Sequence, residues 1–285
     1  MMNSILIILS AFFLLVSCQK DNAVQSHDKA VATFEVQTPF EFEIKSTTGS
    51  VQDSQVNALW YGVYHKKTDG RFVYMSDMSD FVQVTDINDI SVPITLFKDQ
   101  EYKIIFVAQH IEAVPSVDGN VSNCYTYIIN ENGQMSLNPS AVITDGEQLE
   151  AFVYVDEVGP INGNEIRDIT LNRIVSQVNI GTSADVLPNN LNITVSGVPA
   201  AYDIFNGIFS EDKIDLEFQG LAVNGESMKV NDTDYTKLTT LYLLGSNRIS
   251  LTVSDSSDTG KSTTISNVET KVNYKTNIAG RILYE

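Results

Sequence analysis

Histidine, cysteine and acidic side chains could carry chemistry in this sequence, but few of them stand at useful spacings. His27, His65 and His110 have no second metal ligand at a metal-binding spacing, so we expect surface or strand-end roles for all three. The sequence has no G-x-S-x-G, H-E-x-x-H or C-x-x-C motif and no glycine-rich phosphate loop. We therefore predict a protein that is not an enzyme and that binds no metal or cofactor.

Carboxylates are abundant, with 36 Asp and Glu residues in the chain of 285. Asp156 and Glu157 form a pair of the kind that glycosidases use, but so acidic a chain always offers some such pair. Four other acids could offer loop oxygens to calcium: Asp232, Asp234, Asp255 and Asp258. Their spacing is not that of a calcium-binding loop, so we predict neither a catalytic pair nor a calcium site.

Cys18 has the clearest chemical context of any residue. It follows a short apolar run from Ile5 to Val16, and a membrane-spanning helix would need about 20 apolar residues. The ending Leu15-Val16-Ser17-Cys18 resembles the lipobox of bacterial lipoproteins. That resemblance implies that residues 1–17 are a signal peptide and that the Cys18 thiol carries a diacylglycerol. The alternative is an ordinary secretory signal followed by a chance cysteine. Residues 1–17 contain no Lys or Arg, so the usual basic start of a signal peptide is represented by the terminal amine alone.

The formal net charge of −18 limits the partners of the chain. So acidic a protein is repelled by nucleic acid and by anionic lipid headgroups, which argues against both as partners. Once Cys18 is lipidated, Cys124 is the remaining cysteine, and no internal disulfide can form. We expect Cys124 to be a buried, inert thiol in an apolar strand.

The pattern of apolar residues predicts an all-β fold. After a polar tether at residues 18–30, apolar and polar side chains alternate, which is typical of strands with one buried face. We expect strands at residues 31–44, 59–64, 72–74, 90–97, 102–109, 124–129, 149–155, 169–180, 191–196, 240–244, 249–253, 262–266 and 276–284. Residues 198–205 could form one helical turn. Many short strands indicate two tandem β-sandwiches, at 31–181 and 182–285, with the junction in Gly181 to Asn190.

Several stretches together resemble the fimbrillin family, the lipoprotein pilins and related surface proteins of Bacteroidetes (type V pili). The stretches are Val31–Val36, Leu59–Tyr64, Tyr102–Gln109, Ala151–Phe152, Ile169–Ile180 and Thr276–Gly280. The most specific are the Leu-x-Arg-x-x-x-Gln strand and the terminal Thr-Asn-Ile-x-Gly. The resemblance implies two transthyretin-like sandwiches and export to the outer membrane as a lipoprotein. It also implies donor-strand exchange, in which a protease removes the first strand and a neighbour's C-terminal strand replaces it.

This sequence departs from the family pattern at two places. Val31 to Ile44 is the candidate removable segment, and cleavage would fall between Lys45 and Ser46, where stalk pilins usually carry an arginine. The sequence also ends at Glu285, five residues after Gly280, whereas stalk members continue with a segment that can be donated. Lysine at position 45 does not fit an arginine-specific cut. The short C-terminal segment suits a tip or accessory subunit, or an adhesin, better than a stalk subunit. The alternative is a non-polymerising outer-membrane lipoprotein that binds a ligand, such as a glycan.

The strand pattern also predicts which side chains form the cores. We expect four residues to be largely buried in the first sandwich: Trp60, Tyr64, Phe106 and Phe152. We expect four more in the second sandwich or at the junction: Val178, Ile193, Leu243 and Leu251. At the two ends, Val31 to Ile44 should be a strand of the first sandwich, and a strand through Ile278 to Leu283 should close the second.

Overall fold

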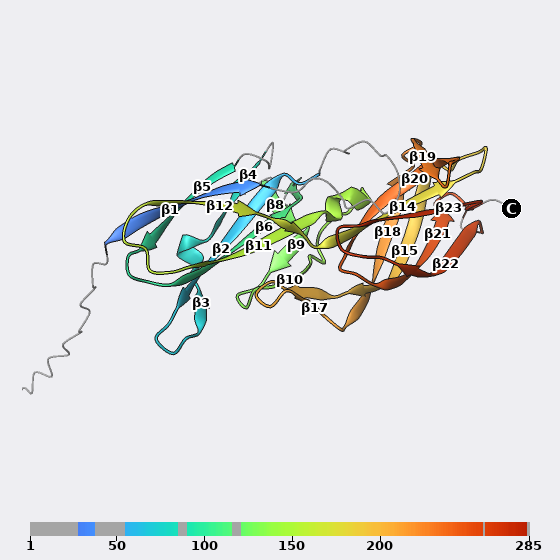
Figure 1. Ribbon diagram of the computed structural model, residues 1–285. Coiled ribbons are helices and arrows are strands. Elements are labelled where there is room, and N and C mark those ends of the chain that lie inside the picture. The colour runs from blue at the N-terminus through green and yellow to red at the C-terminus, as the bar shows by residue number, and fades with distance from the viewer. Residues whose placement is uncertain (1–27, 38–54, 85–89, 116–120, 259, 284–285) are drawn as a thin grey trace, which may run out of the picture.

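The computed structural model describes residues 28–37, 55–84, 90–115, 121–258 and 260–283 (Figure 1). In these ranges the regular elements are strands and two short 3-10 helices, η1 (Ser76–Met78) and η2 (Gly146–Leu149). The sheets pack on one another through two apolar cores. The predicted all-β fold of sandwich type is confirmed.

Two facing sheets enclose the smaller core. The first sheet has three strands, in the order β12 (Glu165–Thr170), β1 (Lys29–Gln37) and β5 (Ile90–Phe97). The second has the order β13 (Asn172–Arg173), β11 (Ala151–Val158), β6 (Tyr102–Gln109), β2 (Ala58–Lys66) and β3 (Phe72–Tyr74), and β4 (Asp80–Gln83) also pairs with β2. The rings of Phe34 in β1 and Phe106 in β6 meet across the two sheets, with centroids 5.0 Å apart.

Strand β6 is buried on both faces, which explains its nearly continuous apolar sequence. Ile104 and Phe106 point into the core shared with β1 and β5. Ile105 and Val107 point to the opposite side and join the larger core. The layer on that side is a four-stranded sheet, in the order β17 (Ile208–Phe209), β16 (Ala201–Asp203), β10 (Gln134–Leu137) and β9 (Tyr127–Ile129).

This four-stranded sheet joins the two halves of the chain. Its strands β9 and β10 come from the N-terminal half, and Met135 of β10 pairs with Tyr202 of β16 from the C-terminal half. The larger core is continuous across the same region. A separate hairpin is formed by β7 (Ile111–Pro115) and β8 (Val121–Tyr125). The division into domains at residues 181 and 182 stays a prediction, because strand pairing alone does not divide the chain there.

The C-terminal half contains two facing four-stranded sheets. One has the order β19 (Ser227–Val230), β20 (Thr233–Leu244), β14 (Val175–Thr182) and β23 (Lys275–Gly280). The other has the order β18 (Lys213–Ala222), β15 (Asn190–Pro199), β21 (Arg248–Asp255) and β22 (Ser262–Glu269). Both sheets contribute side chains to the larger core, among them Val178, Ile193 and Leu251.

Seven of the eight predicted core residues are at most 1% exposed: Tyr64, Phe106, Phe152, Val178, Ile193, Leu243 and Leu251. The eighth residue, Trp60, is partly buried. Its ring lies along the strand over Gly62, where a Cβ atom would collide with it. The Trp60 ring therefore covers the sheet surface beside the larger core without being fully enclosed by it.

Several predicted elements differ from the structure. The helical turn that residues 198–205 could have formed is absent, because this segment ends β15, forms β16 and enters the turn after it at residues 204 and 205. The strand expected at 124–129 is interrupted at Thr126, and Cys124 is partly buried where full burial was expected. The long strand expected at 169–180 is the end of β12 followed by β13 and β14. Strand pairing passes to the C-terminal sheets between Arg173 and Val175.

The two ends of the folded part also differ from expectation. Strand β1 begins at Lys29, so Lys29 and Ala30 belong to the sheet and not to the tether. The rest of the expected first strand, residues 38–44, lies outside the described residues. The last strand, β23, runs from Lys275 to Gly280 and not to Leu283. Ile282 and Leu283 are nevertheless buried, and the Leu283 amide donates to Thr263 Oγ1 of the opposite sheet at 3.0 Å.

Candidate functional site

Strand β1 is the element on which the sequence-based function depends, and it occupies the middle of its sheet (Figure 1). It pairs in parallel with β12 and antiparallel with β5. Every second side chain points inward, because β-strand side chains alternate between faces. Ala30, Ala32, Phe34 and Val36 are each 0–3% exposed. We call the space that β1 fills, between β5 and β12 and over β6, the β1 groove.

Strand β1 is bonded along both of its edges. Residue pairs with β5 run from Lys29 with Phe97 to Val36 with Ile90. Pairs with β12 run from Ala32 with Glu165 to Gln37 with Thr170. A sheet without β1 would expose two rows of backbone groups and the apolar core beneath them. The arrangement therefore allows one strand to replace another, provided that the replacement restores both sets of contacts.

The residues predicted to be modified lie outside the described residues. Cys18, the expected lipidation site, precedes the first described residue. Lys45 and Ser46, the expected cleavage site, fall in the range 38–54 between β1 and β2. Their functions therefore stay predictions. Within the part of the chain that the structure describes, no helix is long and apolar enough to cross a membrane.

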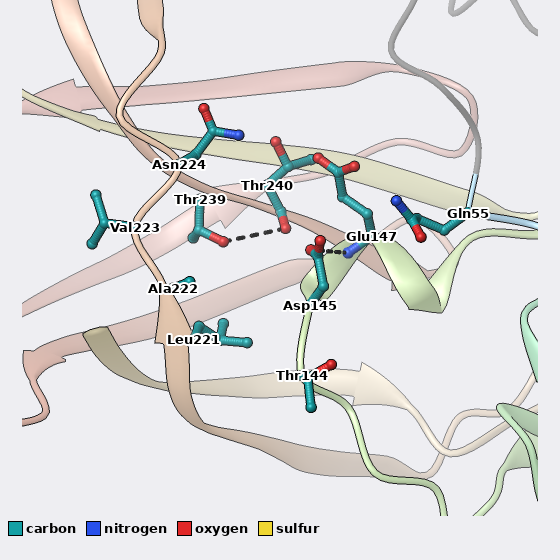
Figure 2. Close-up of a pocket in the computed structure, with 10 residues that line it drawn as sticks. All are labelled: Gln55, Thr144, Asp145, Glu147, Leu221, Ala222, Val223, Asn224, Thr239 and Thr240. Carbon is teal, nitrogen blue, oxygen red and sulfur yellow. Dashed lines mark hydrogen bonds between the residues drawn. The ribbon is translucent and has the colours of Figure 1, made fainter. Parts of the chain in front are cut away.

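A polar pocket lies where segments of both halves of the chain meet (Figure 2). Its volume is about 340 Å³, within the usual range of ligand sites, about 300–1,000 Å³. Side chains from the segment before β2, from η2, from the end of β18 and from β20 surround it. The lining residues are Gln55, Thr144, Asp145, Glu147, Leu221, Ala222, Val223, Asn224, Thr239 and Thr240. No reasoning from the sequence identified this pocket.

Local hydrogen bonds hold the acidic wall of the pocket. Asp145 caps η2, because its Oδ1 accepts the Glu147 amide at 3.0 Å. The Asp145 amide donates in turn to Gln148 Oε1 at 3.3 Å, which completes a capping box. Gly146 packs so closely against Thr240 and Leu241 of β20 that a Cβ atom would not fit there. These contacts fix the position of Glu147 against β20.

The carboxyl group of Glu147 is the most perturbed acid in the pocket. Burial raises its pKa from the usual range to about 7, and the nearby Asp145 charge contributes to the increase. The Lys237 charge and a hydrogen bond with Thr240 act in the opposite direction and lower that pKa. Near neutral pH Glu147 can therefore both donate and accept hydrogen bonds. Together with the threonine hydroxyls and two side-chain amides, it suits a small polar ligand.

Beside the pocket, the buried side chain of Arg173 links residues from the two halves of the chain. Arg173 Nη2 donates to Glu150 Oε1 at 2.8 Å, and the two side chains are 1% and 3% exposed. Arg173 Nη1 also donates to Asn273 Oδ1, at 3.0 Å, in the loop before β23. The guanidinium lies 4.7 Å from the ring centroid of Phe152. Arg173, the arginine of the Leu-x-Arg-x-x-x-Gln pattern, thus links Glu150 with Asn273.

The other chemically suggestive residues have local partners. Asp156 Oδ2 pairs with Arg167 Nε at 2.6 Å, and Glu157 Oε1 pairs with Lys103 Nζ at 3.0 Å. The two neighbouring acids thus form separate ion pairs. His65 Nε2 lies 2.9 Å from Gln100 Oε1, and His110 Nδ1 lies 2.8 Å from the Gln55 carbonyl. Among the described residues, no three His, Cys, Asp or Glu side chains gather as metal ligands would. His27 lies outside the described residues.

Comparison with solved structures shows that this fold occurs in other proteins. No family model and no curated protein matches the sequence. A Bacteroides thetaiotaomicron structure, provisionally described as a polysaccharide-binding protein, matches with a TM-score of 0.51 and 12% identity, over 90% of this chain and 92% of that one. An adhesin-like B. thetaiotaomicron protein gives 0.48 and 10% identity over 89% and 92% of the chains. The fimbrial anchor protein Mfa2 of Porphyromonas gingivalis gives 0.41 and 15% identity over 88% and 91%.

At these identities the likeness defines the fold and not the function. The class is an all-β protein of stacked sheets that spans nearly the full length of these neighbours. The B. thetaiotaomicron structure with a TM-score of 0.51 agrees with the fold that the resemblance drawn from the sequence implied.

Proposed function

We propose that this chain is a fimbrillin-like surface lipoprotein that serves as a fimbrial subunit or adhesin and not as an enzyme. The observation that carries the proposal is the position of β1, which fills the middle of a sheet and seals an apolar core. It is the first strand in the part of the chain that the structure describes, and a cut between β1 and β2 separates it from the strands that follow. The names of the structural neighbours, which include a fimbrial anchor and adhesin-like proteins, support the same role.

The lipid anchor is the first part of the proposal to test. We expect Cys18→Ala to release the protein into soluble fractions, because the acylated residue is its proposed attachment to the outer membrane. Fractionation of cells with metabolic labelling by a palmitate analogue measures both location and acylation. Cys124→Ala is the matched control and should stay labelled and membrane-bound. A Cys18→Ala protein that remains in the membrane would mean that residues 5–16 act as a membrane anchor themselves.

Proteolysis after Lys45 is the second part. We expect protein sheared from cells to begin at Ser46, and Lys45→Gln to leave a full-length lipoprotein that forms no fibres. The reason is that β1 stays covalently attached and keeps the β1 groove filled. Mass spectrometry of the N-terminus and electron microscopy of the sheared material provide the measurements. Lys29→Gln, at the exposed start of β1, is the control.

The outcomes separate polymerisation from its alternative. If the wild type and Lys45→Gln show the same uncut band and neither forms fibres, the polymerising role is wrong. The chain is then better described as a closed binding module anchored by its lipid.

The polar pocket favours that second candidate, a non-polymerising lipoprotein that binds a small polar ligand such as a glycan. Carboxyl, hydroxyl and amide groups can all bind sugar hydroxyls, and the acids Asp145 and Glu147 are fixed in place by η2. None of the described residues that line the pocket has an aromatic ring on which a sugar could stack. Glycan-array binding by the wild type, abolished by Thr239→Ala with Asn224→Ala, would support this candidate. Binding that survives both substitutions would exclude the pocket as the glycan site.

A further inference from the structure

We propose that the β1 groove selects its incoming strand by the order of side-chain sizes along it. The strand must carry an aromatic residue at the position of Phe34 and alanine-sized residues at the two preceding inward positions, those of Ala32 and Ala30. The partner is thus a strand of another subunit with the order small, small, aromatic, β-branched on alternate residues. This inference rests on the proposed strand exchange.

The aromatic position is defined by the contact beneath it. The Phe34 side chain is fully buried, and its ring packs on Phe106 with a centroid distance of 5.0 Å. Phe106 is itself fully buried and also faces the Tyr61 ring, at 6.5 Å. The nearest residue on β5 is the smaller Val92, which cannot fill the place of a lost ring. A strand with a small residue here would leave a cavity over Phe106, and cavities in a packed core are costly.

The two small positions are defined by large neighbours. Ala30 lies opposite Leu96 and Ala32 lies opposite Ile94, and all four side chains are at most 3% exposed. Because no exposed space surrounds these alanines, a larger side chain would have to displace the sheet below. The fourth inward residue, Val36, lies opposite the buried Ile90.

The outward positions of β1 impose much weaker limits. Val31, Thr33 and Glu35 are only partly buried, so larger side chains there can extend over the outer face of the sheet. We therefore expect the groove to accept an added aromatic residue at an outward position of the strand and to reject one at the neighbouring inward position. This contrast provides a matched control in which the same ring is added at Thr33 or at Ala32.

Strand direction follows from the two neighbouring strands. β1 is parallel to β12 and antiparallel to β5, and the two pairings have different hydrogen-bond spacings. A reversed strand would exchange these spacings and would present the sizes in the opposite order. We therefore expect the incoming strand to run in the direction of β1.

The test uses the full mature chain with Cys18→Ala and with a site-specific protease sequence in place of residues 45–50. The cut protein is unfolded in urea and refolded with an excess of two competing peptides, and native mass spectrometry identifies the peptide retained. The reference peptide is Lys29–Gln37 in its natural sequence. Each competitor differs from it in one way. Two carry a single substitution, Thr33→Phe or Ala32→Phe, and a third has the reversed sequence. The fourth, the exchanged peptide, carries both Ala32→Phe and Phe34→Ala, which keeps the composition unchanged.

We expect the exchanged peptide to compete more than about a hundredfold less well than the reference. The reference peptide should also displace the Ala32→Phe and reversed peptides. The Thr33→Phe peptide should be retained to within about threefold of the reference. Equal retention of the reference and exchanged peptides overturns the proposed size selection while leaving strand exchange intact. Retention of no peptide, the reference included, overturns strand exchange itself and the inference with it.

Discussion

At the scale of single residues, Glu147 combines burial with a place in the wall of a pocket. Its side chain is held between the η2 cap and β20, close to the charges of Asp145 and Lys237. Burial disfavours the charged form of a carboxyl group, and a neighbouring negative charge adds to that effect. The protonation of Glu147 therefore depends on the folded structure and is linked to its stability.

We expect Glu147→Gln to remove a pH dependence from folding stability. The pKa of Glu147 is raised in the folded protein to about 7, so its stabilising contribution is present below pH 4.5 and is lost as the pH rises through 7. Between pH 4.5 and about pH 8, the free energy of unfolding of the Gln variant should rise by on the order of 2 kcal/mol relative to that of the wild type. Urea unfolding at a series of pH values measures the difference.

The exposed Glu217 on β18 provides the control for this experiment. The Glu217→Gln variant should follow the wild-type pH profile in parallel. If the pH profile of stability for Glu147→Gln also runs parallel to that of the wild type, the Glu147 carboxyl group titrates in the folded protein as it does in the unfolded chain. The pocket is then more solvated than its geometry indicates.

At the scale of elements, β6 is the strand on which the stacked sheets depend. One of its faces forms the floor of the β1 groove through Phe106, and its other face supports the larger core through Val107. Adjacent residues of one strand thus serve two different cores. A shift of register by one residue would exchange these faces.

We expect Phe106→Ala to lower the free energy of unfolding by about 3–5 kcal/mol, because the ring fills a packed core beneath β1. The control is Ile128→Ala on β9, whose side chain is 45% exposed. It should cost less than about 1 kcal/mol. Denaturant unfolding followed by circular dichroism compares the two variants. A cost at Phe106 as small as that at Ile128 would contradict the assignment of this strand face.

At the scale of the whole molecule, the two halves are joined by more than a connecting segment. The four-stranded sheet of β9, β10, β16 and β17 draws strands from both halves. The Arg173 guanidinium links Glu150 before β11 with Asn273 before β23. These contacts fix the pocket, whose walls come from both halves.

We expect Arg173→Met to destabilise the protein by about 3–5 kcal/mol, because it leaves the buried Glu150 charge without its guanidinium partner. The double variant Arg173→Met with Glu150→Leu should recover part of this loss, since it buries no isolated charge. Arg248→Met, at an arginine whose side chain is 66% exposed, is the control and should have little effect. If the Arg173→Met variant is as stable as this control, Arg173 does not hold the halves together.

Much of the strand pattern could be predicted because it is local. The runs Ile90–Phe97 and Tyr102–Gln109 have the predicted bounds, since alternation or continuous apolarity is visible within each run. Strand β18 was missed although Ile214, Leu216 and Phe218 alternate with charged residues there. The helical turn expected at residues 198–205 failed because pairing of β16 with β10 overrides the weak local preference.

The sequence by itself determined the all-β class, nearly all of the predicted core and the candidate modification sites at Cys18, Lys45 and Ser46, because each depends on residues close together in the chain. Only the tertiary structure decided that β1 lies between β5 and β12, and that Gln55, Glu147 and Thr240 line one pocket. Parallel pairs such as β1 with β12 join segments more than 100 residues apart. No local pattern specifies such partners, because backbone hydrogen bonds are alike in every strand. The choice among partners depends on how all the buried faces fit together at once.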